Sequence, residues 1–262
     1  MAERRTISNI LCTDILLELF QYFYVDELFN AFNDTIHYFP LLLKNGNVQL
    51  HVRHVDSHFR KHIMPNIERN NVISVRIQNM YQMAPVNLGE FNQVHFLVLH
   101  NVTELNWPDN FPKDLKYLTI YVRSKDRHKI FKKALNLDNI KRLEFNSTFL
   151  HFHDCNETLV KPSTIKHLVF NSQRCFINYE FLLNNMPDLQ SLKSSNTYYP
   201  HRTKTNLGIF NRLYTIDLDC KHIDIDVMIL FIIDVSRYSL RQCRLINVNN
   251  SLSSYIADAL IS

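Results

Sequence analysis

The sequence predicts an α/β solenoid, with parallel strands along one side, helical or irregular returns on the other, and a small all-α domain in front. Three observations predict this fold. The heptad Ile140–Asn146 is written again as Ile165–Asn171, with five of seven positions identical. A shorter apolar pattern inside that heptad recurs along the chain at near-equal spacing. Apolar residues at helical spacing come before its first copy, between residues 11 and 43.

The recurring pattern is apolar-x-x-apolar-x-apolar, and successive copies begin 21 to 27 residues apart. A period of this length carrying LxxLxL is typical of leucine-rich repeats. In a strand, positions four and six point to one face, and position eight shares that face. Position eight holds small polar residues in most copies, which we expect to satisfy the backbone of the turn that follows. The eight copies begin at Val72, Val94, Leu115, Ile140, Ile165, Leu189, Leu213 and Leu240.

Segments between the copies have the spacing of return helices. Apolar residues lie three and four apart in Lys129–Asn136 and in Tyr179–Met186, whereas Ile223–Ser236 is apolar nearly all round. One strand and its return cannot cover their own apolar face, but stacked copies can share one interior. The alternative is a conventional α/β domain whose strands look alike because buried strands are rich in valine and leucine.

Composition excludes several classes of protein. Only three of the 262 residues are glycine, so the chain cannot build a phosphate-binding loop, a dinucleotide fingerprint or a nucleophile elbow. The net charge of +4 is scattered, and no nucleic-acid partner is expected from it. Five cysteines without a CxxC pair, no signal-like start and no membrane-length apolar run favour a reducing compartment, cytoplasmic or nuclear. No membrane association is expected.

The N-terminal segment predicts three short helices. The first has apolar residues at helical spacing from Leu11 to Phe23, and Asp26 is expected to cap the second. Pro40 is expected to end or kink a third helical segment, residues 35–43. Such a small core often leaves an apolar surface that needs a partner. We place this domain at residues 7–46, a helical connector at 47–71 and the solenoid at 72–262.

This segment resembles the start of an F-box, whose family pattern reads LPxEIL-L-x-I-F-x-Y-L followed by an acidic-leucine pair. Residues 14–20, Tyr22-Phe23 and Glu27-Leu28 match the pattern, and Cys12 stands where the family has proline. F-boxes often precede leucine-rich repeats. The resemblance implies docking on a Skp-type adaptor and, through it, on a cullin. The residues expected to dock are Leu11, Ile15, Leu16, Leu19, Phe20 and Leu28, and each has the alternative interpretation of F-box core.

The resemblance further implies that the chain is the substrate receptor of a Skp–cullin–F-box ubiquitin ligase. Such a receptor is not an enzyme, needs no cofactor and contributes proximity alone. Its target protein would bind strand side chains at positions three, five and seven, which face the concave side of a curved solenoid. Aromatic residues and arginine are favoured at binding hot spots. The expected target-binding residues are Phe96, His100, Tyr117, Tyr121, Arg142, Glu144, His167 and Lys193.

Other readings of the chain stay open. A leucine-rich scaffold that does not join a ligase has the Cys12 departure as its support. An RNA-binding solenoid would use the basic residues between Lys125 and Lys133. Two histidine groups could bind metal, but neither has a full ligand set, so no metal site is predicted. These groups are the helical stripe His51, His54, His58 and His62, and the extended run His151, His153 and Cys155.

Overall fold

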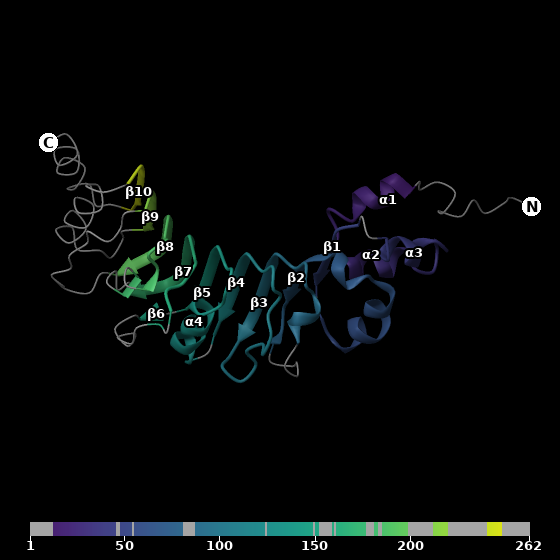
Figure 1. Cartoon of the computed structure of the whole chain (residues 1–262), viewed down its shortest axis with the longest axis horizontal. Coiled ribbons are helices and arrows are strands. Elements are labelled where there is room, and N and C mark those ends of the chain that lie inside the picture. The colour runs from purple at the N-terminus through teal and green to yellow at the C-terminus, as the bar shows by residue number, and fades with distance from the viewer. Residues whose placement is uncertain are drawn as a thin grey trace, which may run out of the picture. The chain divides into compact units, whose positions relative to one another are not determined.

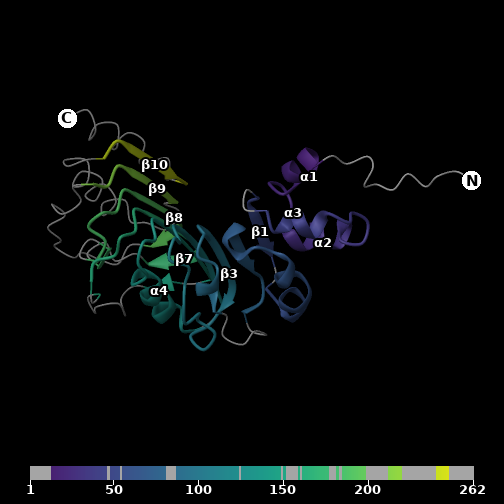
Figure 2. The same cartoon turned by 45° about the vertical axis from the view of Figure 1, so that its right-hand side comes forward.

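The computed structural model describes residues 13–45, 48–53, 55–80, 87–123, 125–148, 150–151, 159, 161–176, 181–182, 185–198, 212–219 and 240–247. The chain forms two compact units. The first comprises Met1–Asn101 with Asn106–Tyr117, and the second comprises Val102–Leu105 with Leu118–Ser262. The helices α1 to α3 belong to the first unit and α4 to the second (Figures 1 and 2).

Three short helices open the first unit: α1 (Thr13–Leu19), α2 (Val25–Phe32) and α3 (Phe39–Leu43). Their core contains the rings of Phe20 and Phe39, which stack with centroids 5.9 Å apart. The helix boundaries differ from expectation in two places. Tyr24, not Asp26, precedes α2, and its backbone N–H donates to Oε2 of Glu27 at 3.1 Å. Pro40 lies in the first turn of α3, where its missing N–H would have no intrahelical partner anyway.

The expected helical connector at 47–71 is wrong at its start. Strand β1 (Leu50–Arg53) lies there and pairs in parallel with β2 (Val72–Ile77), so the sheet begins one strand before the first copy of the pattern. Leu50 and Val52 are buried while His51 and Arg53 are partly exposed. This alternation is a strand signal, but four residues are too few for it to stand out against the histidine spacing.

Short helical pieces follow β1. They are the π-helix η2 (Phe59–Ile63) and the 3-10 helices η3 (Met64–Asn66) and η4 (Arg69–Asn71). Helix α2 contacts β1 directly, because Glu27 of α2 forms an ion pair with Arg53 of β1 at 3.2 Å. After β2 come the 3-10 helix η6 (Leu88–Glu90) and β3 (Phe96–Val102), which pairs in parallel with β2 and whose last residue belongs to the second unit.

The second unit is a stack of strands in chain order. Apart from β6, which is off the path and pairs with β7, the hydrogen-bonded order is β4-β5-β7-β8-β9-β10, and every strand pair whose register is described is parallel. Figure 1 shows these strands following one another. The strands are β4 (Tyr117–Val122), β5 (Arg142–Ser147), β6 (Leu150–His151), β7 (His167–Phe176), β8 (Ser191–Tyr198), β9 (Thr215–Asp219) and β10 (Gln242–Ile246).

The register confirms the alignment of the repeats. The two copies of the opening heptad lie side by side, with Leu143 opposite Leu168 and Phe145 opposite Phe170. The row of Leu143 and Leu168 continues through β8 and β9 as Leu192 and Ile216. Side chains at positions four and six of β5 and β7 are buried, so the expected inward face is confirmed there. The solenoid-like α/β layout is therefore shown within each unit.

A repeated backbone geometry marks the start of these strands. One carbonyl oxygen before each strand accepts N–H groups from two consecutive residues of the next repeat, at 2.7 to 3.1 Å. The recurrence shows that the segments are equivalent in backbone geometry as well as in apolar pattern. In the second unit the accepting carbonyls belong to Lys141, Lys166, Gln190 and Tyr214.

The return helix α4 (Arg127–Leu135) confirms the helix expected at Lys129–Asn136. Its Phe131 ring packs against Phe145 and Phe170, with centroids 5.2 and 5.5 Å apart, so the helix covers the inward side of β5 and β7. The helix expected at Tyr179–Met186 is described only in part, and there Phe181 and Leu182 are buried. The helix expected at Ile223–Ser236 lies outside the described residues.

Position eight follows the expectation only in part. Asn101 adopts a left-handed backbone, φ 58°, and its Nδ2 donates to the carbonyl oxygen of Gln78 in the preceding repeat at 3.4 Å. Asn247 has the same φ, but its side chain is exposed and donates to Asp219. Asn79 is exposed too, so the inward orientation expected for it is wrong. Asparagine tolerates φ > 0 better than most residues, so Asn247 can adopt the left-handed backbone of the turn although its side chain is exposed.

Candidate functional site

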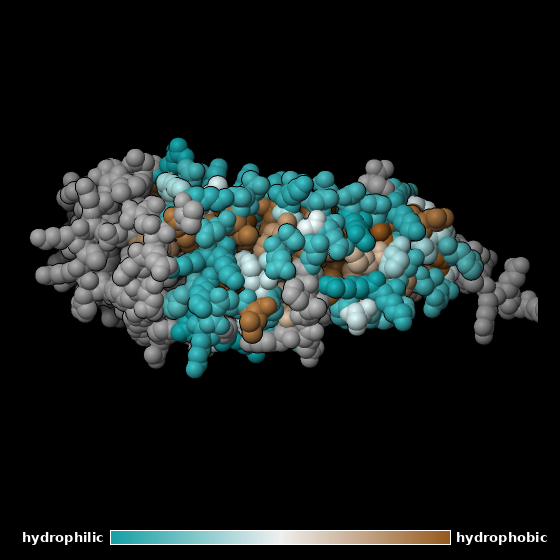
Figure 3. All heavy atoms as spheres, turned by 60° about the horizontal axis from the view of Figure 1, so that its bottom comes forward, coloured by the Kyte–Doolittle hydropathy of each residue, from teal (hydrophilic) through white to brown (hydrophobic). Residues whose placement is uncertain are grey.

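The helices of the first unit leave large apolar side chains in solvent. Ile15 is 44 %, Tyr22 73 %, Phe23 46 % and Leu41 72 % exposed. We name these four residues the helical apolar surface. They lie on α1, on the turn after it and on α3. On the face shown in Figure 3, apolar residues reach the surface among polar ones near the N-terminal helices, at the right of the view.

The structure divides the residues expected to dock on an adaptor. Leu16, Phe20 and Leu28 are buried, so their side chains form the core and offer no free surface. Ile15 is exposed and Leu19 is half-buried, and Leu11 lies outside the described residues. Tyr22, Phe23 and Leu41 are exposed candidates that the sequence did not single out. Helical periodicity marks an apolar stripe, but it does not distinguish the part that packs from the part left over.

The first unit carries part of the expected target-binding surface. Phe96 of β3 and Tyr117, which opens β4, stack with ring centroids 4.6 Å apart and planes 7° apart. Both rings are partly exposed. His100 also lies on β3, four residues after Phe96. Burial lowers the pKa of His100, and the charge of Arg76 lowers it further. A neutral imidazole can accept or donate hydrogen bonds at neutral pH.

The second unit holds the other expected residues on the outward face of its strands. Arg142 and Lys193 are exposed, and Tyr121, Glu144 and His167 are half-buried. Lys193 forms an ion pair with Asp217 on the neighbouring strand at 3.3 Å. Burial lowers the pKa of His167, and the charges of Arg142 and Lys166 lower it further. Phe96 and Tyr117 belong to the first unit, and Tyr121 and Arg142 belong to the second.

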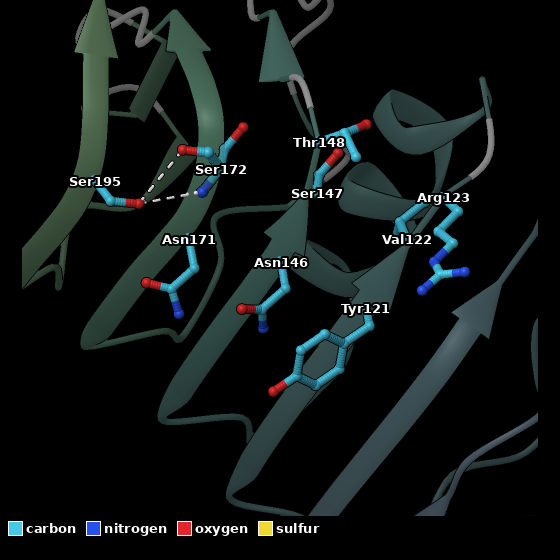
Figure 4. A pocket seen from close by; sticks show the side chains of 9 residues that line it. All are labelled: Tyr121, Val122, Arg123, Asn146, Ser147, Thr148, Asn171, Ser172 and Ser195. Atoms are coloured by element: carbon cyan, nitrogen blue, oxygen red, sulfur yellow. Dashed lines mark hydrogen bonds between the residues drawn. The ribbon is translucent and has the colours of Figure 1, made fainter.

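A pocket is lined by the carboxyl ends of β4 and β5 and by the middle of β7 and β8. Its volume is about 360 Å³, within the range of ligand-binding clefts. Figure 4 shows the Tyr121 ring at one side, the two asparagines from neighbouring strands next to it and Ser195 beyond. Sequence reasoning placed Tyr121 here but passed over the asparagines, because a single Asn carries no signal until register aligns it with another. The lining residues are Tyr121, Val122, Arg123, Asn146, Ser147, Thr148, Asn171, Ser172 and Ser195.

Hydrogen bonds order one end of this pocket. Nδ2 of Asn171 donates to Oε1 of Glu144 at 2.8 Å. The Ser195 hydroxyl accepts from the Ser172 N–H at 3.2 Å and lies 3.3 Å from the carbonyl oxygen of Phe170, to which it can donate. Nδ2 of Asn146, by contrast, is buried and makes no hydrogen bond with any described residue. Buried polar groups are almost always paired, so this unpaired donor marks Asn146 as an unusual position.

The structure corrects the expected histidine stripe. His51 lies on strand β1, whereas His58 and His62 lie at and within η2, with ring centroids 4.8 Å apart, so the stripe is not one helix. Among the described residues, no group of three or more His, Cys, Asp or Glu side chains could hold a metal ion. His54, His153 and Cys155 lie outside the described residues.

Of the basic residues between 125 and 133, Lys125 precedes α4 and the others lie within it, with Lys132 and Lys133 in its last turn. Lys129 forms an ion pair with Glu104 at 2.8 Å. The hydrogen bond that Lys129 donates to Glu104, and then the negative charge of Glu104, raise the pKa of Lys129. An acidic neighbour within this basic run weakens its field toward a polyanion, which favours the reading as a solvated helix face over an RNA site.

In the part of the chain that the structure describes, no helix combines the length and the hydropathy that crossing a bilayer requires. Comparison with family models, with curated proteins and with solved structures gives no match to the chain.

Proposed function

We propose that the chain is the substrate-recognition subunit of a Skp–cullin–F-box ubiquitin ligase, with the N-terminal helices bound to the adaptor and the strands bound to a target protein. The helical apolar surface carries this proposal. Three of its residues, Ile15, Tyr22 and Phe23, belong to the positions that resemble an F-box. Exposed apolar patches that the fold does not cover are typical of protein-interaction sites.

The division between buried and exposed residues supports a docking role. Leu16, Phe20 and Leu28 complete the small core, so the helices do not need Tyr22 or Leu41 for packing. Burying a leucine or tyrosine of this kind against a partner contributes roughly 1.5–3 kcal/mol. Several such residues on one docking surface would supply a large part of the affinity for an adaptor.

The outward strand faces support the second half of the proposal. They present aromatic, charged and amide side chains in place of one uniform apolar stripe, a composition that suits recognition of a particular protein surface. Such a receptor would do no chemistry itself. It would hold a target lysine at high effective concentration near a charged conjugating enzyme.

Adaptor capture by the purified full chain tests the proposal. We expect Leu41→Asp and Phe23→Asp to weaken binding of a Skp-type adaptor at least about tenfold, because a carboxylate would be buried at the contact. Leu105→Asp is the matched control, since Leu105 is 94 % exposed and lies in the second unit. All three variants should keep the melting temperature of the parent.

The exposed residues make a cleaner test than Leu16, whose substitution would damage the core. Failure of the parent chain to bind the adaptor, or equal binding by Leu41→Asp and Leu105→Asp, would refute ligase assembly. The chain would then be an interaction scaffold.

A further inference from the structure

We propose that the pocket lined by β4, β5, β7 and β8 binds the main chain of an extended polypeptide segment through the carboxamides of Asn146 and Asn171. The inference deepens the proposed function and rests on it, because it names what the pocket would recognise in a target protein. Each step follows from the register of the strands and the hydrogen bonds of the pocket.

Register places the two amides side by side. Asn146 of β5 is the direct partner of Asn171 of β7, which in turn is opposite Ser195 of β8. Neighbouring strands are about 4.8 Å apart, so the row from Asn146 to Ser195 extends about 10 Å. That length corresponds to roughly three residues of extended chain at about 3.3 Å each.

The hydrogen bonds assign a role to each member of the row. Ser195 is engaged with the backbone around Phe170 and Ser172, so it shapes the end of the pocket. The Asn171 amide donates to Glu144, which fixes its orientation. Neither Oδ1 of Asn171 nor the amide of Asn146 has a hydrogen-bond partner among the described residues.

A carboxamide complements a peptide bond. It offers one acceptor and two donors in one plane, matching the N–H and C=O of a backbone amide. Nδ2 of Asn146 makes no hydrogen bond where it lies, so turning the carboxamide toward a ligand carbonyl breaks no interaction. Figure 4 shows the Tyr121 ring beside Asn146, where it offers a face for an apolar side chain of the ligand.

Charge favours a neutral main chain over an ionic group. Glu144 is held by Asn171, and Lys193 is paired with Asp217. Of the lining residues only Arg123 is charged, and Figure 4 shows its guanidinium apart from the two asparagines. An anion would therefore meet a single cation at the rim, whereas a backbone amide would meet paired donors and acceptors.

Selection of random peptides displayed on phage against the full chain supplies the probe. We expect an enriched peptide to lose affinity about tenfold with Asn146→Ala and with Asn171→Ala, the loss typical of one or two hydrogen bonds. Asn92→Ala, at an exposed asparagine of the first unit, should leave affinity unchanged.

Chemical changes in the peptide then separate main-chain from side-chain recognition. At one or more positions, N-methylation should abolish binding while alanine at the same position retains it. No enriched peptide, or binding indifferent to both asparagine variants, overturns the inference. Asn146-dependent binding to a glycan array without peptide binding overturns it as well.

The same variants should still capture the adaptor, because both asparagines belong to the second unit and the helical apolar surface to the first. Adaptor capture by the parent chain together with no enriched peptide, or with peptide binding unchanged in both asparagine variants, would refute the pocket inference alone. Loss of adaptor capture by the parent chain would refute the proposed function.

Discussion

The three N-terminal helices and the strands β5, β7 and β8 differ in how completely they bury their apolar side chains. The helices bury Leu16, Phe20 and Leu28 but leave Tyr22 and Leu41 largely exposed. The strands bury their inward rows and present mostly amides, charges and hydroxyls outward. Three short helices have too little interior for all their apolar side chains, whereas each strand shares its interior with two neighbours.

The difference teaches that the two surfaces suit different partners. The helical apolar surface gains free energy when a partner removes it from water, so shape and hydrophobicity dominate its recognition. The outward strand face is already hydrated, so a partner must replace hydrogen bonds to water with equally good ones. Specificity is therefore expected from the strands and hydrophobic affinity from the helices.

The largest expected effect comes from comparing an apolar side chain buried in the strand core with one left exposed on the helices. Phe170→Ala should lower the free energy of unfolding by about 3–5 kcal/mol, because it opens a cavity beneath Phe131 and beside Phe145. Phe23→Ala should stay within about 0.5 kcal/mol, since Phe23 is half in solvent. Urea unfolding of both variants measures the difference. Equal losses would show that Phe23 belongs to the core and would end the contrast.

A smaller gain in stability is expected at Ser194. It occupies an inward position between Phe170 and Leu218, and its buried hydroxyl makes no hydrogen bond with any described residue. Ser194→Ala removes that unpaired hydroxyl and should stabilise the chain by about 1 kcal/mol. Ser195→Ala is the matched control, which should destabilise because its hydroxyl is bonded to β7. Thermal melts that rank the two variants the other way would contradict this assignment of the two faces.

The smallest expected effect is a decrease in folding stability at acidic pH. Burial lowers the pKa of His51, His100 and His167 below the ordinary 6.5, so the folded chain binds fewer protons than the unfolded chain. Stability should therefore fall as pH drops below about 6.5 and level off below the folded pKa values. Melting temperatures between about pH 7.5 and about pH 5 measure this, and His167→Gln should flatten the decline. A steeper decline in His167→Gln would contradict the expected contribution of His167 to the loss of stability at acidic pH.

Much of the fold was predictable because the repeats restate one local rule. Leu143 and Leu168 needed only their spacing to be aligned, and the structure pairs them directly. Strand β1 was missed because two buried residues in four are too short a pattern to recognise. Of the candidate sites, Tyr121 was predictable as an outward aromatic residue, whereas the unpaired amide of Asn146 was not.

The sequence by itself determined which residues share a face, because the strand period of two and the helix period of 3.6 are local properties of the backbone. It also determined the order of the repeats and the presence of three N-terminal helices. Only the tertiary structure decided that Leu16 is buried and Leu41 exposed, and that Asn146 meets Asn171. Those outcomes depend on which neighbours compete for the same space, and packing between segments distant in sequence settles that competition.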